Sequence, residues 1–153
     1  MWYVARVQFI NDGRFDLIIS QAAARFPEVA RKALRAGAAV YAAQMKKNLK
    51  GLLSEKATGE LVGAFGITPV KVDAESNYNA HLGFDGYQKP GYGKFAVKGV
   101  PFQLIARSFE SGAGNWRRAT PFAKPAVKAK KSEADQEMIR VAEEELQKIA
   151  NSR

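Results

Sequence analysis

Cysteine is absent from this chain of 153 residues, and histidine occurs once. The lack of cysteine excludes disulfide bonds and zinc–thiolate sites, and it fits a reducing compartment. No apolar run reaches the length of about eighteen residues that a membrane-spanning helix needs. Residues 1–6, MWYVAR, lack the basic-then-apolar order of a signal peptide. We therefore expect a soluble, intracellular protein.

Groups for catalysis are scarce. The single histidine, His81, falls within a predicted strand, and an imidazole without a partner is more often structural than catalytic. No two carboxylates share a motif, and the glycine-rich segments 91–94 and 112–114 lack the strand–loop–helix setting of a phosphate-binding loop. We expect no catalytic residue, cofactor or metal, and hence no enzyme. A hydrolase that uses His81 is an alternative, and it would require a carboxylate within hydrogen-bonding reach of the imidazole.

Positive charge is abundant and concentrated in one segment. The net charge of the chain is +9. Residues 86–131 contain one acid, Glu110, and ten cations: Lys89, Lys94, Lys98, Arg107, Arg117, Arg118, Lys124, Lys128, Lys130 and Lys131. This segment alone therefore carries the whole excess, because the fourteen cations and fourteen acids of the remainder cancel. A clustered excess is typical of a surface that meets an anionic partner, and a solubilising face is the alternative interpretation.

The pattern of apolar residues predicts one α+β domain over residues 1–153. Alternation in 1–10 and a second apolar segment at 15–19, joined by a turn, predict an N-terminal hairpin within residues 1–20. The clearest helix is Glu28–Lys50, where a proline precedes apolar residues at spacings of three and four. Its apolar stripe is rich in alanine and glycine, so we expect a sheet or another copy of the helix to approach it closely.

Shorter elements follow the long helix. Residues 58–61, TGEL, predict a turn into a new element, and 64–73 predict a strand that Pro69 interrupts at an edge or a bulge. The segments 78–84 and 100–109 predict two further strands. The sheet is therefore expected to be small and mostly antiparallel.

Two glycine-containing loops and a second helix complete the predicted domain. Segments 86–99 and 111–119 are expected to be flexible loops, and the first is long enough to favour a function. After Pro121 the chain is expected to be helical, with Ser132 and Asp135 as a capping pair. An apolar stripe of this helix is predicted at Met138, Ile139, Ala142, Leu146 and Ile149. The small sheet should therefore pack against the long N-terminal helix, with the C-terminal helix beside it.

The segment 106–127 is predicted to be the main contact surface. The candidate interaction residues of this segment and of the preceding loop are Lys89, Lys94, Lys98, Trp116, Arg117, Arg118 and Lys124. Aromatic residues interleaved with cations can stack on bases and neutralise phosphates, which favours a nucleic-acid-binding protein. Flexible loops and a basic face equally fit a subunit of a larger assembly. Composition leaves both classes open.

Several short motifs occur in a set order. They are the long helix 28–50, TGEL at 58–61, FESG at 109–112, PFAKPA at 121–126 and a C-terminal helix. In this order and spacing, residues 28–150 resemble the tail-completion, or head–tail joining, proteins of long-tailed bacteriophages and prophages. Residues 54–57 and 104–108 depart from the family's pattern, which affects the surface contacts more than the role.

The resemblance implies a non-enzymatic virion component. Such a protein would form a ring at the neck or the upper end of the tail and would join the tail to the capsid. Its partners would be other copies of itself and neighbouring head-closure, tail-terminator or tail-tube proteins, with no membrane contact. Because genomic DNA passes through the neck, the basic residues would face either that DNA, in a non-specific contact, or an acidic neighbouring ring. A basic nucleic-acid-binding protein is the alternative.

Overall fold

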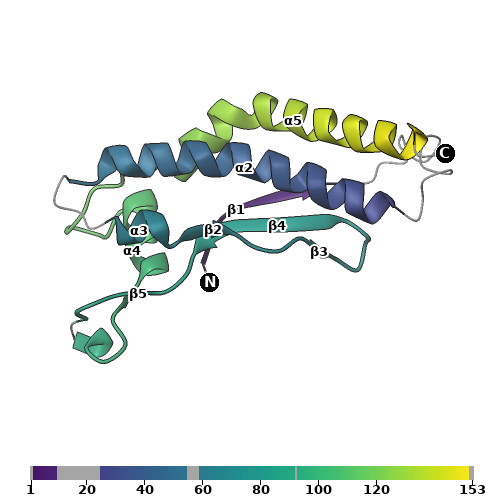
Figure 1. Cartoon of the computed structure of the whole chain (residues 1–153). Coiled ribbons are helices and arrows are strands. Elements are labelled where there is room, and N and C mark those ends of the chain that lie inside the picture. The colour runs from purple at the N-terminus through teal and green to yellow at the C-terminus, as the bar shows by residue number, and fades with distance from the viewer. Residues whose placement is uncertain (1, 10–24, 55–58, 92, 152–153) are drawn as a thin grey trace.

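Two long helices and a small antiparallel sheet form the computed structural model of this protein (Figure 1). The structure describes residues 2–9, 25–54, 59–91 and 93–151. The helices are α2 (Phe26–Leu52), α3 (Glu60–Gly63), α4 (Phe102–Ser111) and α5 (Ala123–Asn151), with one 3-10 turn, η1 (Gly93–Phe95). The strands are β1 (Trp2–Phe9), β2 (Phe65–Ile67), β3 (Lys71–Val72), β4 (Tyr78–Phe84), β5 (Tyr87–Gln88) and β6 (Val100–Pro101). The predicted α+β class, with a long N-terminal helix and a C-terminal helix, is confirmed.

Strand β4 is the centre of the sheet. β1 pairs with it in antiparallel register along one side. β2 and β3 share the other side, and Pro69 lies in the gap between them. Proline has no N–H to donate to a ladder, so it is tolerated at such an edge. The predicted interruption of 64–73 is therefore confirmed.

The alternation of β4 in the sequence reflects its packing. Every second residue belongs to the main core: Tyr78, Ala80, Leu82 and Phe84. The amide of Asn79, which is also buried, donates to a carboxylate oxygen of Asp73 (3.1 Å). The same carboxylate accepts the N–H of Asn77 (2.9 Å), and this bond is the main cause that lowers the pKa of Asp73 below its usual value. Asp73 thus organises the polar turn that leads into the central strand.

Helix α2 packs against the sheet and against α5, which runs antiparallel to it (Figure 1). Its buried residues recur at spacings of three and four, and many are alanine or glycine. At Gly37 an added Cβ would lie 2.5 Å from Met138 Cγ of α5, so the missing side chain admits that methionine. Near the other end of α2 the amide of Asn48 donates to the carbonyl of Phe122 (3.0 Å). The expected approach of a sheet is confirmed, and the second helix at the stripe is α5 of the same chain.

Three phenylalanine rings join the sheet to the start of α5. The ring of Phe84 lies edge-to-face against Phe65 (5.1 Å between centroids) and against Phe122 (5.9 Å). Such pairs contribute about 0.5–1.5 kcal/mol beyond the apolar area that they bury. Phe102 and Phe109 are also buried, so these aromatic residues belong to the core and are not available to stack on bases.

Residues 100–109 are not a strand, and that prediction is wrong. Only Val100–Pro101 is extended, and α4 begins at Phe102. The buried residues Phe102, Ala106 and Phe109 are spaced four and three apart, which is the period of a helix. Aromatic and β-branched residues favour strands in isolation, but here the packing of one helical face decides the conformation.

Helix α5 is longer than the sequence analysis predicts. A helix after Pro121 is confirmed, but α5 begins at Ala123, so Ser132 and Asp135 lie inside it. Their assignment as a capping pair is therefore wrong. Ile139 is also outside the buried stripe, because its side chain is 53% exposed.

Two predicted segments are described in part. The strand within residues 1–10 is confirmed as β1, whereas the second strand of the proposed hairpin, 15–19, lies outside the described residues. The segment 86–99 contains β5 and η1, and the pairing of β5 with β6 closes it into a lobe at one end of the molecule (Figure 1). The flexibility of 86–99 and of 111–119 stays a prediction.

Candidate interaction surface

The loop between α4 and α5 presents the predicted aromatic residue and cations. Gly112 ends α4 with a φ of 79°, and a Cβ on it would lie 2.9 Å from the carbonyl oxygen of Arg117, so both geometry and space favour glycine. The N–H of Ala113 donates to the Arg117 carbonyl (3.0 Å), and the N–H of Trp116 donates to the Ala113 carbonyl (3.1 Å). The side chain of Trp116 is 96% exposed in this turn. An indole at such a position is available to a partner and does not contribute to the core.

Arg117 is held in place without neutralisation of its charge. Its guanidinium carbon lies 3.5 Å from the centroid of the Phe109 ring. A guanidinium stacked on a ring keeps its N–H donors in the plane, where they can bind a carboxylate or a phosphate. Within the described ranges, no carboxylate forms an ion pair with Arg117 or Arg118.

Glu110 fixes the other end of this loop. Its buried carboxylate accepts the backbone N–H groups of Phe122 (2.9 Å), Ala123 (3.0 Å) and Lys124 (3.1 Å). These donors belong to the first turn of α5, which has no intrahelical acceptors for them. The carboxylate also lies at the positive end of the helix dipole. Glu110 therefore acts as the N-terminal cap of α5 from a different helix.

This role of Glu110 was not predicted from the sequence. The available indication was its isolation, since it is the one acid among eleven charged residues in 86–131. A second bond closes the same junction, because the N–H of Thr120 donates to the carbonyl of Phe109 (2.7 Å). The FESG and PFAKPA motifs, eleven residues apart at Glu110 and Pro121, are thus joined in space.

The predicted lysines of segment 86–99 lie apart from this loop, on the lobe. Lys89, Lys94 and Lys98 are all exposed, and the ammonium of Lys94 lies 5.2 Å from the centroid of the Phe95 ring. Gly99 closes the base of the lobe, where an added Cβ would lie 2.5 Å from the Gln88 carbonyl oxygen. The seven candidate residues are therefore all exposed, but they form a lobe group, a loop group and Lys124 on α5.

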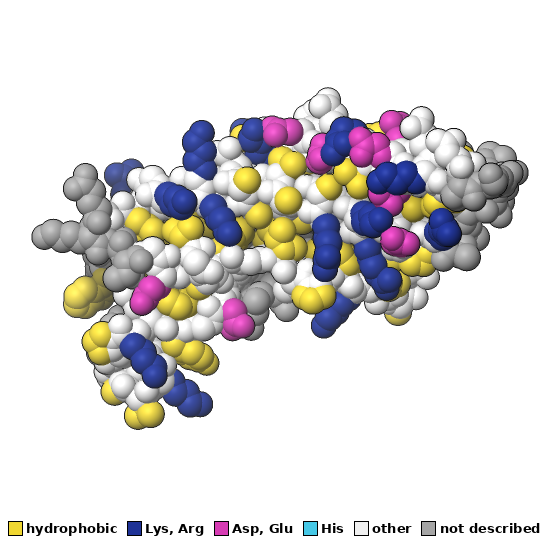
Figure 2. All heavy atoms as spheres, viewed as in Figure 1, with side chains coloured by type: hydrophobic (Ala, Val, Ile, Leu, Met, Phe, Trp, Pro, Cys, Tyr) yellow, Lys and Arg dark blue, Asp and Glu magenta, His cyan; other side chains and the backbone are white. Residues whose placement is uncertain are grey.

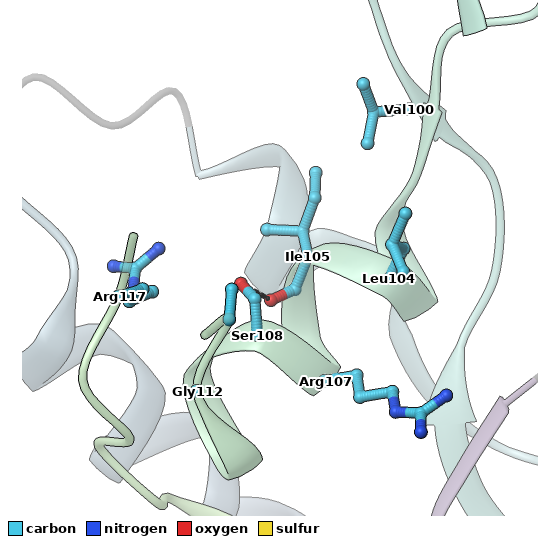
Figure 3. A pocket seen from close by; sticks show the side chains of 8 residues that line it. Val100, Leu104, Ile105, Arg107, Ser108, Gly112 and Arg117 are labelled. Carbon is cyan, nitrogen blue, oxygen red and sulfur yellow. Dashed lines mark hydrogen bonds between the residues drawn. The ribbon is translucent and has the colours of Figure 1, made fainter. Parts of the chain in front are cut away.

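A cleft of about 530 Å³ lies between α4, β6 and the loop of residues 112–117. It is lined by Val100, Leu104, Ile105, Arg107, Ser108, Gly112, Ala113 and Arg117. Figure 3 shows Arg117 on one side and Arg107 on the other, with Ile105 and Ser108 between them. The hydroxyl of Ser108 donates to the Ile105 carbonyl (2.7 Å), so it is already occupied. The cleft therefore offers an apolar floor with a cation on either side.

The basic segment has few internal partners. Of its ten cations, only Lys130 forms an ion pair with a carboxylate among the described residues, and that partner is Glu133. By contrast, the other described ion pairs connect Lys32, Arg140 and Lys148 to Glu28 of α2 and to acids within residues 137–145 of α5. Figure 2 shows the result on one face of α2 and α5, where the coloured charged side chains near the start of α5 are Lys or Arg and both signs mix toward the other end.

The structure adds cations that the sequence analysis did not select. Lys47 and Lys50 are exposed in the last turns of α2. The bond between Asn48 and Phe122 places this end of α2 beside the first turn of α5, which carries Lys124. The two helix ends thus form one basic surface, which a count of charge along the sequence conceals.

Groups for other chemistry are not concentrated here. His81 lies in β4, where its backbone N–H donates to the hydroxyl of Thr68 (2.9 Å) and its backbone carbonyl accepts the Thr68 N–H (2.8 Å). Across the residues that the structure describes, no three histidine or acidic side chains lie close enough to hold a metal ion. No helix in those ranges has both the length and the apolar character required to cross a bilayer.

Comparison with known proteins adds no relative: no family model, no curated protein and no solved structure matches this chain.

Proposed function

We propose that this chain is a non-enzymatic structural protein of a bacteriophage virion. It acts at the head–tail junction or the upper end of the tail, as a tail-completion or neck protein, and assembles as a ring that joins tail to capsid. It is made in the cytoplasm of the host bacterium and ends in the virion. The observation that carries the proposal is the basic end of the molecule, where nine exposed cations form no ion pair with a carboxylate of the described residues. Such a cluster of positive charge favours an anionic partner.

The junction between α4 and α5 supports the same proposal. The resemblance to the phage family depends on FESG and PFAKPA, and here the glutamate of the first motif binds the backbone of the second. This contact gives a physical reason for the two motifs to occur together. It also leaves the intervening residues, including Trp116, free to vary with the partner.

A ring provides partners for the basic end. In this position Arg117, Arg118 and Lys124 contact an acidic neighbouring protein, such as a head-closure, tail-terminator or tail-tube subunit, or they face DNA in the channel. Contacts with DNA would be non-specific, since they involve phosphates and not base edges.

Charge reversal tests the proposal. Arg117→Glu combined with Arg118→Glu should leave the fold intact, because both side chains are exposed, and should strongly reduce the yield of joined, infectious particles. A matched control is Arg31→Glu with Arg35→Glu on α2, which changes the net charge equally on exposed residues elsewhere. Normal assembly and infectivity of the loop variant would contradict the proposal. Portal, capsid and major tail genes beside the coding sequence would support it independently.

The second candidate is a basic nucleic-acid-binding protein. The observation that favours it is the exposed Trp116 beside two arginines that form no ion pair with a described carboxylate, since indoles stack on bases while arginines bind phosphates. Such a protein should bind single or double strands alone, with an affinity that falls steeply as salt rises. A structural subunit should bind them weakly and co-purify with tails or particles. Replacement of Trp116 by alanine should weaken the binding of nucleic acid only if the chain is a nucleic-acid-binding protein.

A further inference from the structure

A second exposed surface lies far from the cleft, on the outer face of α5. Ile139 is 53% exposed, although its neighbours Met138 and Ala142 face α2. Glu143 lies four residues later, so both side chains project from the same face of the helix. No cation among the described residues forms an ion pair with Glu143. This face therefore combines an uncovered aliphatic side chain with an unpaired carboxylate.

The cleft has the complementary chemistry. Its apolar floor includes Leu104, which is 44% exposed, and Ile105. Arg107 and Arg117 flank that floor, and neither has a described carboxylate partner (Figure 3). A helix that presents an aliphatic anchor and a carboxylate one turn apart suits such a groove, since anchors at i and i+4 are the usual mode of helix recognition.

The two surfaces cannot meet within one molecule. The cleft lies beside the junction where Glu110 holds Ala123, at the start of α5. Ile139 is sixteen residues further along the helix, which corresponds to about 24 Å at a rise of about 1.5 Å per residue. A contact between them would therefore join different copies of the chain.

We propose that the Ile139–Glu143 face of α5 in one copy docks into the cleft between α4 and the 112–117 loop of the next copy. Ile139 covers Leu104, and the carboxylate of Glu143 binds the guanidinium of Arg117. Because the two surfaces differ, the contact is head-to-tail, and it closes into a ring where the rotation between copies permits. The inference rests on the proposed function, and it names the surfaces by which that ring would form.

Disulfide trapping tests the contact directly, because the chain has no cysteine of its own. A mixture of the single variants Leu104→Cys and Ile139→Cys should give covalent dimers under mild oxidation, while each variant alone should not. The doubly substituted chain should give a ladder of dimers, trimers and larger species, as a head-to-tail contact requires. Disulfide formation demands that the two Cβ atoms approach to about 4 Å, so random collisions contribute little. Ala129→Cys, at another exposed position of α5, replaces Ile139→Cys in the control mixture and should give no dimer.

A charge exchange tests the polar half of the contact. Arg117→Glu or Glu143→Arg, added to the cysteine pair, should each reduce the yield of cross-linked dimer several-fold. The two changes together should restore most of that yield, because the pair is re-formed with opposite polarity. Loss without restoration would overturn the assignment of Glu143 as the partner of Arg117.

The remaining outcomes separate this inference from the proposed function. If an amine-reactive cross-linker gives oligomers of the unmodified chain and the mixed cysteine variants give no dimer, the ring stands and these surfaces are wrong. If neither reagent gives oligomers, ring formation by the chain itself is contradicted as well. A Leu104→Cys variant that dimerises alone would indicate a twofold contact and would overturn the head-to-tail arrangement. Co-purification of another acidic protein that depends on Arg117, without any copy-to-copy disulfide, would assign the cleft to that protein.

Discussion

The two parts of α5 carry opposite charge and treat it differently. Residues 123–131 contain four lysines and no acid, whereas residues 132–151 contain six acids and two cations. Four of the six acids of the distal part form ion pairs, and one of them, Glu145, binds both Lys32 of α2 and Lys148. Among the described residues, the lysines of the first part form only the Lys130–Glu133 pair. Lys124 lies in the first turn, at the positive end of the helix dipole, which is unfavourable for a cation. Charge therefore supports the fold at the distal end of the helix and opposes it at the first turn, which separates an end with paired charges from the end that we propose as the contact surface.

The largest effect should distinguish two aromatic residues of the same segment. Phe122→Ala removes a fully buried ring from the core, so the free energy of unfolding should fall by about 3–5 kcal/mol. Trp116→Ala removes an exposed ring and should change it by about 0.5 kcal/mol or less. Denaturation in urea, followed by far-UV circular dichroism, measures both. Equal losses would remove the distinction between scaffold and contact residues in this segment.

The next effect concerns the cap that joins the two motifs. Glu110→Gln keeps the size of the side chain but removes the negative charge to which three backbone N–H groups donate. The free energy of unfolding should therefore fall by about 1–3 kcal/mol. The control is Glu133→Gln, at an exposed residue of α5 that pairs with Lys130. This control should lower the free energy of unfolding by roughly 0.5 kcal/mol or less, as is usual for an ion pair on the surface. A Glu110 variant no weaker than the control would show that α5 does not need this cap.

The smallest effect is a pH dependence at the distal end. Bonds from Lys148 first and Lys32 second lower the pKa of Glu145 below its usual value. A carboxyl group whose pKa is depressed by folding contributes stability above its unfolded pKa, and this contribution disappears as the pH falls through the folded pKa. Glu145→Gln should therefore melt slightly below the unmodified protein at about pH 6 and match it in strong acid. Glu143→Gln, at an acid without a described ion pair, should show no such difference. Thermal melts of both variants and of the unmodified protein at several pH values measure this difference.

The long elements were predictable because local patterns determine them. Helix Glu28–Lys50 and the break at Pro69 follow from periodicity and from the chemistry of proline, and both are confirmed. Helix α4 was not predictable in this way, because an apolar segment of ten residues satisfies a strand and a helix almost equally. Its conformation depends on the packing of one face, which is a property of the assembled fold.

The candidate surface was predictable in part. The exposure of Trp116 and Arg117 follows from a polar, glycine-containing loop, and the structure places both there. The cap by Glu110 and the contribution of Lys50 depend on contacts between segments distant in the sequence. Charge counted along the chain cancels over the residues outside 86–131 taken together, and so conceals lysines of α2 that lie beside α5 in space.

The divided edge of the sheet has a consequence for how the chain resists aggregation. β2 and β3 offer three and two residues on either side of Pro69, which has no N–H. A strand from another molecule cannot pair continuously along such an edge. Uncontrolled fusion of sheets, the route by which concentrated subunits form amyloid-like aggregates, is thereby blocked on this side. If copies gather in a ring as we propose, they would therefore associate through side chains and not through continuous pairing of strands along this edge.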